Sequence, residues 1–207
     1  MRVLNQHEKE LCLYCISSLP KTNFHLIEGN PVEKMFWGRI NIEKATAFYY
    51  FTKHGKIQNL LHHIKYKDMK EVAYTVGRLF GQDLKQDGIF RDVDYIIPVP
   101  LHPKKLKIRG YNQSEYFGSG LADALHVPIL VNNLVRTVHS ATQTNKSRFQ
   151  RWTNVSDIFS LTEPELLKNK HILVVDDVIT TGATIEASYV AMENLEVRFS
   201  VATIAFA

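Results

Sequence analysis

The sequence predicts an α/β protein with a mostly parallel sheet and helices on both faces. Short apolar runs rich in β-branched residues alternate with segments of helical periodicity between residues 45 and 207, and this order builds parallel sheets with crossover helices. Polar segments follow two of these runs, where open α/β sheets bind ligands. At 207 residues the chain suits one medium domain with a small appendage. We therefore predict an N-terminal arm and hood over residues 1–44 and a main domain over residues 45–207.

Each element of this order has a local signal. Turn pairs are mixed with aromatic residues in residues 17–44, which predicts a loop-rich hood. Apolar runs bounded by turn residues predict strands, and apolar residues three and four positions apart predict helices. The predicted strands are 45–52, 93–99, 130–137, 171–175 and 197–206, and the predicted helices are 55–63, 69–85, 112–125 and 185–194.

The composition is that of an ordinary globular protein. Hydrophobic residues make up 45% of the chain, which is enough for a sizeable core. No apolar stretch is long enough to span a bilayer, and residues 1–10 are polar, unlike the apolar core of a signal peptide. We expect no membrane insertion and a cytoplasmic location. The formal charge of +4 suits an anionic substrate or nucleic acid without deciding between them.

The segment from His171 to Thr184 is the most informative part of the sequence. Its apolar strand ends on Asp176 and Asp177, and a Thr/Gly loop then leads into a helix. Free N–H groups at a helix N-terminus bind phosphate, and Gly182 lets the backbone approach a ligand closely. Two acids would repel a neighbouring phosphate unless they bind another group, such as sugar hydroxyls or Mg²⁺. A ribose carrying a 5-phosphate satisfies the whole arrangement.

A second constellation follows the predicted strand 93–99. Residues 98–113 read PVPLHPKKLKIRGYNQ, so Lys104, Lys105, Lys107 and Arg109 bring positive charge to the same edge of the sheet as the acids. Cations and backbone N–H groups are what holds a pyrophosphate. On charge alone an exposed basic loop is the commoner explanation. The position after a strand favours a binding role.

The acid pair and its following loop resemble the phosphoribosyl-pyrophosphate (PRPP) signature of type I phosphoribosyltransferases. By this resemblance Asp176 and Asp177 bind the ribose 2- and 3-hydroxyls, and the next residues bind the substrate and its 5-phosphate. The resemblance implies a type I phosphoribosyltransferase-like fold that uses PRPP with Mg²⁺. The residues it assigns to substrate binding are Val178, Ile179, Thr180, Thr181, Gly182, Ala183 and Thr184.

Further motifs resemble the ComF family, also called the GntX or competence protein F family. Residues 98–102 and 109–113 carry this likeness, and residues 64–66 resemble the family's Lys-aromatic element. Members are phosphoribosyltransferase-like proteins associated with DNA uptake and the use of DNA as a nutrient. The resemblance therefore implies catalytic roles for Asp176, Asp177 and Arg109, and single-stranded DNA and a competence helicase as partners.

Residues 140–155 resemble the family's mobile-loop region. They are polar and contain Lys146, Arg148 and Arg151 with Phe149 and Trp152 between them. A basic lid would exclude water from a sugar cation and stabilise the departing pyrophosphate. The same composition suits contact with single-stranded DNA, whose bases stack on aromatic rings. It also suits a solvated loop whose two rings pack on the body of the protein.

Cys12 and Cys15 form a single Cys-x-x-Cys pair near the start of the sequence. A structural zinc ion takes four ligands, and many ComF-family members have two cysteine pairs in an N-terminal zinc element. Two explanations stay open. The residues are a pair of reduced thiols, or they belong to a zinc site whose other ligands lie outside this sequence.

Two functions follow from these observations. The first is a Mg²⁺-dependent, phosphoribosyltransferase-like enzyme that uses PRPP and an acceptor that the sequence leaves undefined. The second is a catalytically silent adaptor that senses PRPP or a nucleotide and binds single-stranded DNA or a competence partner, because a fold can persist after its chemistry is lost.

Overall fold

The computed structural model describes residues 12–137 and 158–207. Its main sheet has four strands in the order β1-β6-β5-β2, and all three neighbouring pairs are parallel. The predicted parallel α/β architecture is therefore confirmed. The strands are β1 (Lys44–Tyr50), β2 (Tyr95–Pro98), β5 (His171–Ile179) and β6 (Arg198–Phe206).

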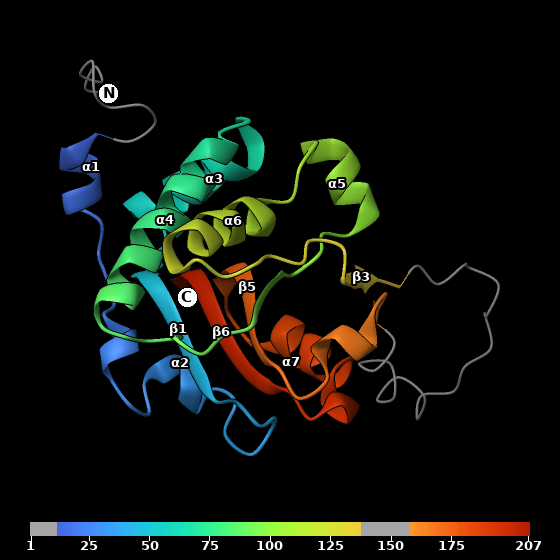
Figure 1. Cartoon of the computed structure of the whole chain (residues 1–207). Coiled ribbons are helices and arrows are strands. Elements are labelled where there is room, and N and C mark those ends of the chain that lie inside the picture. The colour runs from blue at the N-terminus through green and yellow to red at the C-terminus, as the bar shows by residue number, and fades with distance from the viewer. Residues whose placement is uncertain (1–11, 138–157) are drawn as a thin grey trace.

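Helices cover both faces of this sheet (Figure 1). On one face lie α3 (Lys56–Tyr66), α4 (Lys70–Gln86) and α6 (Gln113–Leu125), and on the other lie α2 (Pro31–Lys34) and α7 (Ala183–Val190). Strand β5 supplies both cores, because Leu173 and Val175 join the first and Ile172 and Val174 the second. Successive strand side chains point to opposite faces, so a continuous apolar run is what a strand buried on both faces requires.

Two predicted elements differ from the structure around the ligand-binding edge. Strand β5 continues past residue 175 through the acid pair, since Asp176 and Val178 still pair with Thr203 and Ala205 of β6. The basic segment is not a loop but contains the short helix α5 (Pro103–Arg109). Proline at its first position and Gly110 in the left-handed conformation at its end are the helix signals that its basic composition obscured.

The predicted strand 130–137 is shorter and lies outside the main sheet. Strand β3 (Leu134–Arg136) pairs antiparallel with β4 (Phe159–Leu161) in a separate two-stranded sheet. Residues 138–157, which include Lys146, Arg148 and Arg151, lie outside the described residues. The predictions for the basic loop therefore stay predictions.

The N-terminal segment covers the outer edge of β1. It contains α1 (Leu13–Ser17), η1 (Phe24–Leu26) and α2, joined by irregular backbone. The Thr22 N–H donates to the Phe48 carbonyl at 3.0 Å, and the Asn30 side-chain amide donates to the Ala45 carbonyl at 2.8 Å. These bonds satisfy backbone groups that an edge strand would otherwise expose.

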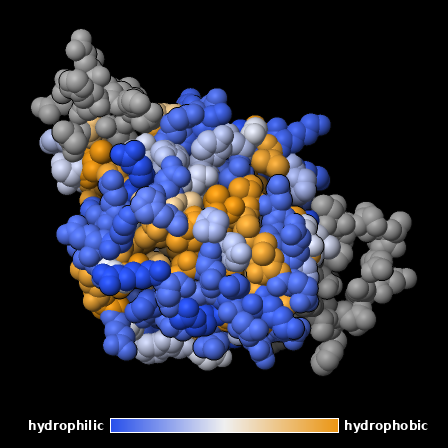
Figure 2. Space-filling model, in the orientation of Figure 1, coloured by the Kyte–Doolittle hydropathy of each residue, from blue (hydrophilic) through white to orange (hydrophobic). Residues whose placement is uncertain are grey.

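Apolar residues gather in the middle of the face shown in Figure 2, surrounded by hydrophilic ones. Among residues 12–137 and 158–207, no helix has the length and hydropathy needed to cross a membrane.

The remaining short elements are the 3-10 turns η4 (Pro164–Leu167) and η5 (Glu193–Leu195).

Candidate functional site

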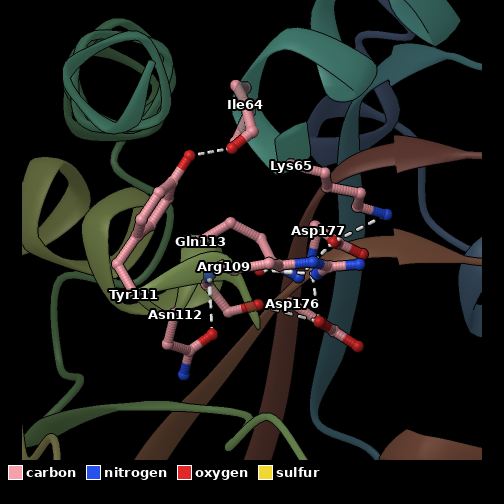
Figure 3. Close-up of polar contacts among 9 residues, drawn as sticks. Ile64, Lys65, Arg109, Tyr111, Asn112, Gln113, Asp176 and Asp177 are labelled. Carbon is pink, nitrogen blue, oxygen red and sulfur yellow. Dashed lines mark hydrogen bonds and ion pairs between the residues drawn. The ribbon is translucent and has the colours of Figure 1, made fainter. Parts of the chain in front are cut away.

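The acid pair lies near the carboxyl end of β5, and side chains from three helices converge on it (Figure 3). Asp176 accepts a hydrogen bond from the Ser114 hydroxyl at 2.9 Å and another from the Asp177 N–H at 2.8 Å. Asp176 is partly exposed, whereas Asp177 is buried. Asp176 is therefore the acid nearer the surface, and Asp177 is the more deeply buried one.

Asp177 is held by two donors on its Oδ2 atom. The Gln113 side-chain amide donates at 2.5 Å, and the Lys65 ammonium forms an ion pair at 2.8 Å. Only 22% of the Lys65 side chain and 10% of the Asp177 side chain is exposed. Water screens such a pair weakly, so Lys65 compensates much of the negative charge of the acid pair.

The segment between α5 and α6 places these donors. Asn112 caps α6, since its side-chain oxygen accepts from the Ser114 N–H at 3.1 Å while its amide donates to the Val99 carbonyl at 3.0 Å. The Tyr111 hydroxyl donates to the Ile64 carbonyl and so joins this segment to α3. The helix start and the end of α3 are thereby fixed beside the acids.

Arg109 is the cation of α5 that reaches this network. Its guanidinium donates to the Gln113 Oε1 atom at 3.0 Å and lies 5.3 Å from the centre of the Tyr66 ring. Gln113 therefore connects Arg109 to Asp177. Lys104 and Lys105 lie on the solvent-exposed surface of α5, so their predicted contact with pyrophosphate stays a prediction.

The surroundings of Asp176 alter its ionisation. Loss of hydration, and secondly the negative charge of Asp177, raises the pKa of Asp176 to about 7. The Asp177 N–H, the Ser114 hydroxyl and Lys65 act in the opposite direction. Hydroxyl groups of a bound sugar would donate further hydrogen bonds to the Asp176 carboxylate and so favour its ionised form.

The loop after β5 joins the acid pair to the N-terminus of α7. Thr180, Thr181 and Thr184 are exposed, whereas Gly182 is buried and has a φ of 78°. A Cβ atom on Gly182 would lie 2.7 Å from the Phe36 ring, so glycine is required for both conformation and space. The side chains of Val178 and Ile179 pack into the cores, so they fix the position of the loop.

The hood holds this loop from the other side. The Arg39 guanidinium donates to the Thr181 carbonyl at 3.1 Å and to the Met35 carbonyl at 3.0 Å, and it forms an ion pair with Glu186 of α7. The Arg39–Thr181 contact joins residues 142 positions apart in the sequence. The hood thus contacts and supports the predicted phosphate loop.

Comparison with known proteins relates this geometry to a family. The phosphoribosyl transferase domain family matches residues 112–207. The DNA utilization protein YhgH of Shigella flexneri is 31% identical over 86% of this chain and 75% of its own length. Competence protein F of Haemophilus influenzae is 33% identical over 61% of this chain and 57% of its own.

The chain belongs to the ComF family. The resemblance found in the sequence is thus confirmed, and so is the type I phosphoribosyltransferase-like fold. Among solved structures, a crystal structure of adenine phosphoribosyltransferase aligns with a TM-score of 0.45 and 18% identity, over 71% of this chain and 75% of that one.

Several residues of this ComF-family site were not assigned roles from the sequence. Ser114 and Arg39 carried no signal, because neither belongs to a recognisable spacing. Lys65 and Gln113 lie within the motifs that resemble the family, but only the tertiary structure brings them to Asp177. Their place inside these motifs is the signal that could have identified them.

The described residues contain no group of three or more His, Cys, Asp or Glu side chains that could hold a metal ion. Cys12 is buried and Cys15 exposed, and the Cys15 N–H donates to the Cys12 sulfur at 3.2 Å. The two explanations for this cysteine pair therefore both stay predictions. Two adjacent carboxylates do fit Mg²⁺, which keeps water and takes further oxygens from its substrate.

Proposed function

We propose that this protein binds PRPP together with Mg²⁺ and transfers the phosphoribosyl group to an acceptor. The observation that carries the proposal is the juxtaposition of the Asp176–Asp177 pair with the loop at residues 180–184, at one edge of the sheet. The acids match the hydroxyl groups of a ribose 5-phosphate, and the loop that follows them matches its phosphate.

In this proposal the sugar is held through its hydroxyls and its phosphate. Asp176 accepts the hydrogen bonds of the ribose hydroxyls. Asp177 orients the Asp176 carboxylate, because its N–H donates to that carboxylate. The exposed Thr180, Thr181 and Thr184 hydroxyls and the N-terminus of α7 face the 5-phosphate in this proposal. Because Arg39 and Gly182 already fix the loop, little conformational entropy is lost on binding.

The pyrophosphate lies toward α5 in this proposal. Arg109 is held by Tyr66 and Gln113 beside the acids and would contact the pyrophosphate oxygens, with Lys104 and Lys105 adding positive charge. Bound Mg²⁺, coordinated mainly by pyrophosphate and ribose oxygens, would supply charge neutralisation for the leaving group.

The proposed reaction replaces one bond at the ribose C1 carbon by another. The C1–oxygen bond to pyrophosphate breaks, and pyrophosphate leaves with the electron pair. The acceptor donates a lone pair to C1 and then loses its proton. Positive charge on the sugar develops beside Asp176, whose carboxylate stabilises it electrostatically.

The cellular role proposed for this activity follows from the relatives. The names DNA utilization protein and Competence protein F suggest that the acceptor, or the product of the reverse reaction, derives from imported DNA. The experiment that tests the proposal therefore separates binding from turnover.

Titration calorimetry with PRPP, with and without Mg²⁺, measures binding. We expect Asp176→Asn and Asp177→Asn each to weaken PRPP binding by about ten- to a hundred-fold, since a charge-assisted hydrogen bond contributes about 1.5–3 kcal/mol. The matched control is Asp94→Asn, an acid at the amino end of the sheet that hydrogen-bonds to the His171 N–H. This control should leave PRPP affinity unchanged.

Pyrophosphate release, measured across nucleobases and amines, tests turnover. Release that depends on Asp176 and on Mg²⁺ supports the enzyme. PRPP binding without release from any acceptor would favour the silent adaptor, and unchanged affinity in both acid variants would refute the site.

A further inference from the structure

One oxygen of each carboxylate in the acid pair already receives donors from the protein itself (Figure 3). The Oδ1 atom of Asp176 accepts hydrogen bonds from the Ser114 hydroxyl at 2.9 Å and from the Asp177 N–H at 2.8 Å. The Oδ2 atom of Asp177 receives the Gln113 amide at 2.5 Å and the Lys65 ammonium at 2.8 Å. A carboxylate oxygen has about two lone-pair sites, so a metal ion would have to displace a donor to bind either of these two atoms.

Lys65 is placed by the residues on either side of it. On one side Ile64 is fully buried, and its carbonyl accepts the Tyr111 hydroxyl. On the other side the centre of the Tyr66 ring lies 5.3 Å from the Arg109 guanidinium. The last turn of α3 is thus attached to the segment between α5 and α6, and the Lys65 ammonium is held against the acid pair.

The charge of the acid pair is largely balanced before any ligand binds. Only 22% of the Lys65 side chain and 10% of the Asp177 side chain is exposed, so water screens their attraction weakly. Arg109 adds a second positive charge, because its guanidinium donates to Gln113, whose amide donates to Asp177. Lys65 also acts on Asp176, since burial is the main cause that raises the pKa of that acid and the Lys65 charge lowers it. Two negative charges are therefore accompanied by two positive ones.

An acid pair with balanced charge discriminates between two classes of ligand. Mg²⁺ gives up its water reluctantly and binds where carboxylates or phosphates supply negative charge. A sugar hydroxyl is neutral and requires only an acceptor. The Lys65 ammonium repels the metal ion and does not repel the hydroxyl.

We infer that Lys65 is a positioning residue that keeps the acid pair a site for neutral hydroxyl groups and prevents it from binding a free metal ion. The ammonium does so by occupying Oδ2 of Asp177 and by offsetting the charge of both acids. This inference rests on the proposed function for the identity of the sugar. The negative charge that Mg²⁺ requires then has to come from the pyrophosphate of PRPP, so the metal ion binds together with PRPP and not before it.

The test measures metal binding to the whole chain in the absence of PRPP. Mn²⁺ replaces Mg²⁺ as the probe, and electron paramagnetic resonance measures the free ion at about pH 8, where Asp176 is mostly ionised. We expect Lys65→Met, which removes the charge, to bind Mn²⁺ at least about ten-fold more tightly than the parent protein. A merely structural role would not produce this gain, since a distorted site binds metal ions less well. Lys65→Arg retains the charge and should behave as the parent protein does.

Lys67→Met is the matched control, because it removes the same charge from an exposed lysine two residues further along the chain. It should leave the Mn²⁺ affinity unchanged. Adding Asp176→Asn to Lys65→Met should abolish the gain, which would assign the Mn²⁺ to the acid pair. Lys65→Met leaves a buried carboxylate unpaired, which is destabilising, so Lys65→Gln, which keeps an N–H donor without the charge, is measured beside it.

A gain in either uncharged variant supports the inference. It is overturned if Lys65→Met and Lys65→Gln both bind Mn²⁺ within about three-fold of the parent protein, or if the gain survives the addition of Asp176→Asn. None of these titrations uses PRPP. A parent protein that fails to bind PRPP would therefore refute the proposed function, while the Mn²⁺ titrations would still decide the role of Lys65.

Discussion

At the scale of single residues, the ionisation of Asp176 makes stability depend on pH. Its pKa is raised to about 7, chiefly by loss of hydration and then by Asp177, whereas an unfolded aspartate has a pKa of about 3.9. Between these values the folded protein binds more protons than the unfolded chain. The free energy of unfolding therefore falls as pH rises through this window, and the penalty is fully present above pH of about 7.

We predict that Asp176→Asn is increasingly more stable than the parent protein as pH rises from about 4 to 8. The gain should reach roughly 1–3 kcal/mol, because one pKa unit is worth about 1.4 kcal/mol and the substitution also replaces the charged acceptor of the Ser114 hydroxyl by a neutral one. Urea unfolding at several pH values measures it.

Asp94→Asn is the control with the opposite sign. The His171 N–H, as the largest cause, holds the pKa of Asp94 below its usual value, so this carboxylate stabilises the fold above the unfolded pKa. That stabilisation is lost as pH falls through the lower, folded pKa. The Asp94 variant should thus be the less stable one at neutral pH and converge on the parent in acid. A parallel pH dependence of the two variants would contradict the assignment for Asp176.

At the scale of elements, the crossing of α4 and α6 determines where the site's donors lie. A Cβ atom on Gly120 of α6 would lie 2.0 Å from the Tyr74 carbonyl of α4, and one on Gly77 of α4 equally close to the Phe117 carbonyl. The two helix backbones are therefore in direct contact, with no room for a side-chain atom between them at these positions.

We predict that Gly120→Ala destabilises the protein by about 1–3 kcal/mol, the typical cost of overpacking. Because α6 also carries Gln113 and Ser114, the same change should weaken PRPP binding. Ser119→Ala in the neighbouring position is the control, since its hydroxyl donates to the Glu115 carbonyl of its own helix, and it should alter stability by less than about 0.5 kcal/mol. Equal stability of the two variants would show that the helices can separate at little cost.

At the scale of the whole molecule, the modest net charge of +4 limits any contact with nucleic acid. We predict weak binding of single-stranded DNA that weakens further with salt, at a slope of about 0.7 per phosphate neutralised. Replacing Lys146, Arg148 and Arg151 by Gln should lower this slope by about 2 if their segment is the contact. Fluorescence anisotropy at several salt concentrations measures the slope.

The control for this prediction removes the same charge elsewhere. Lys53, Lys85 and Lys168 are exposed lysines from other parts of the chain, and replacing them by Gln should leave the slope nearly unchanged. Equal slopes in both triple variants would assign the binding to the overall charge rather than to the basic segment. That result would also weaken the adaptor hypothesis.

The sequence by itself determined the properties that depend on neighbouring residues. The order of strands and helices follows from local periodicity, and the acid pair with its Thr/Gly loop is one consecutive run, so the fold, the family and the centre of the candidate site could be predicted. Helix α5 was missed because its basic residues suggested an exposed loop, although His102-Pro103 and Gly110 marked its ends.

Only the tertiary structure decided which distant side chains meet. Gln113 and Asp177 are 64 positions apart, and Lys65 reaches the same carboxylate from α3. Such contacts depend on how the helix layer packs on the sheet, because a small rotation of α3 or α6 would direct these side chains elsewhere.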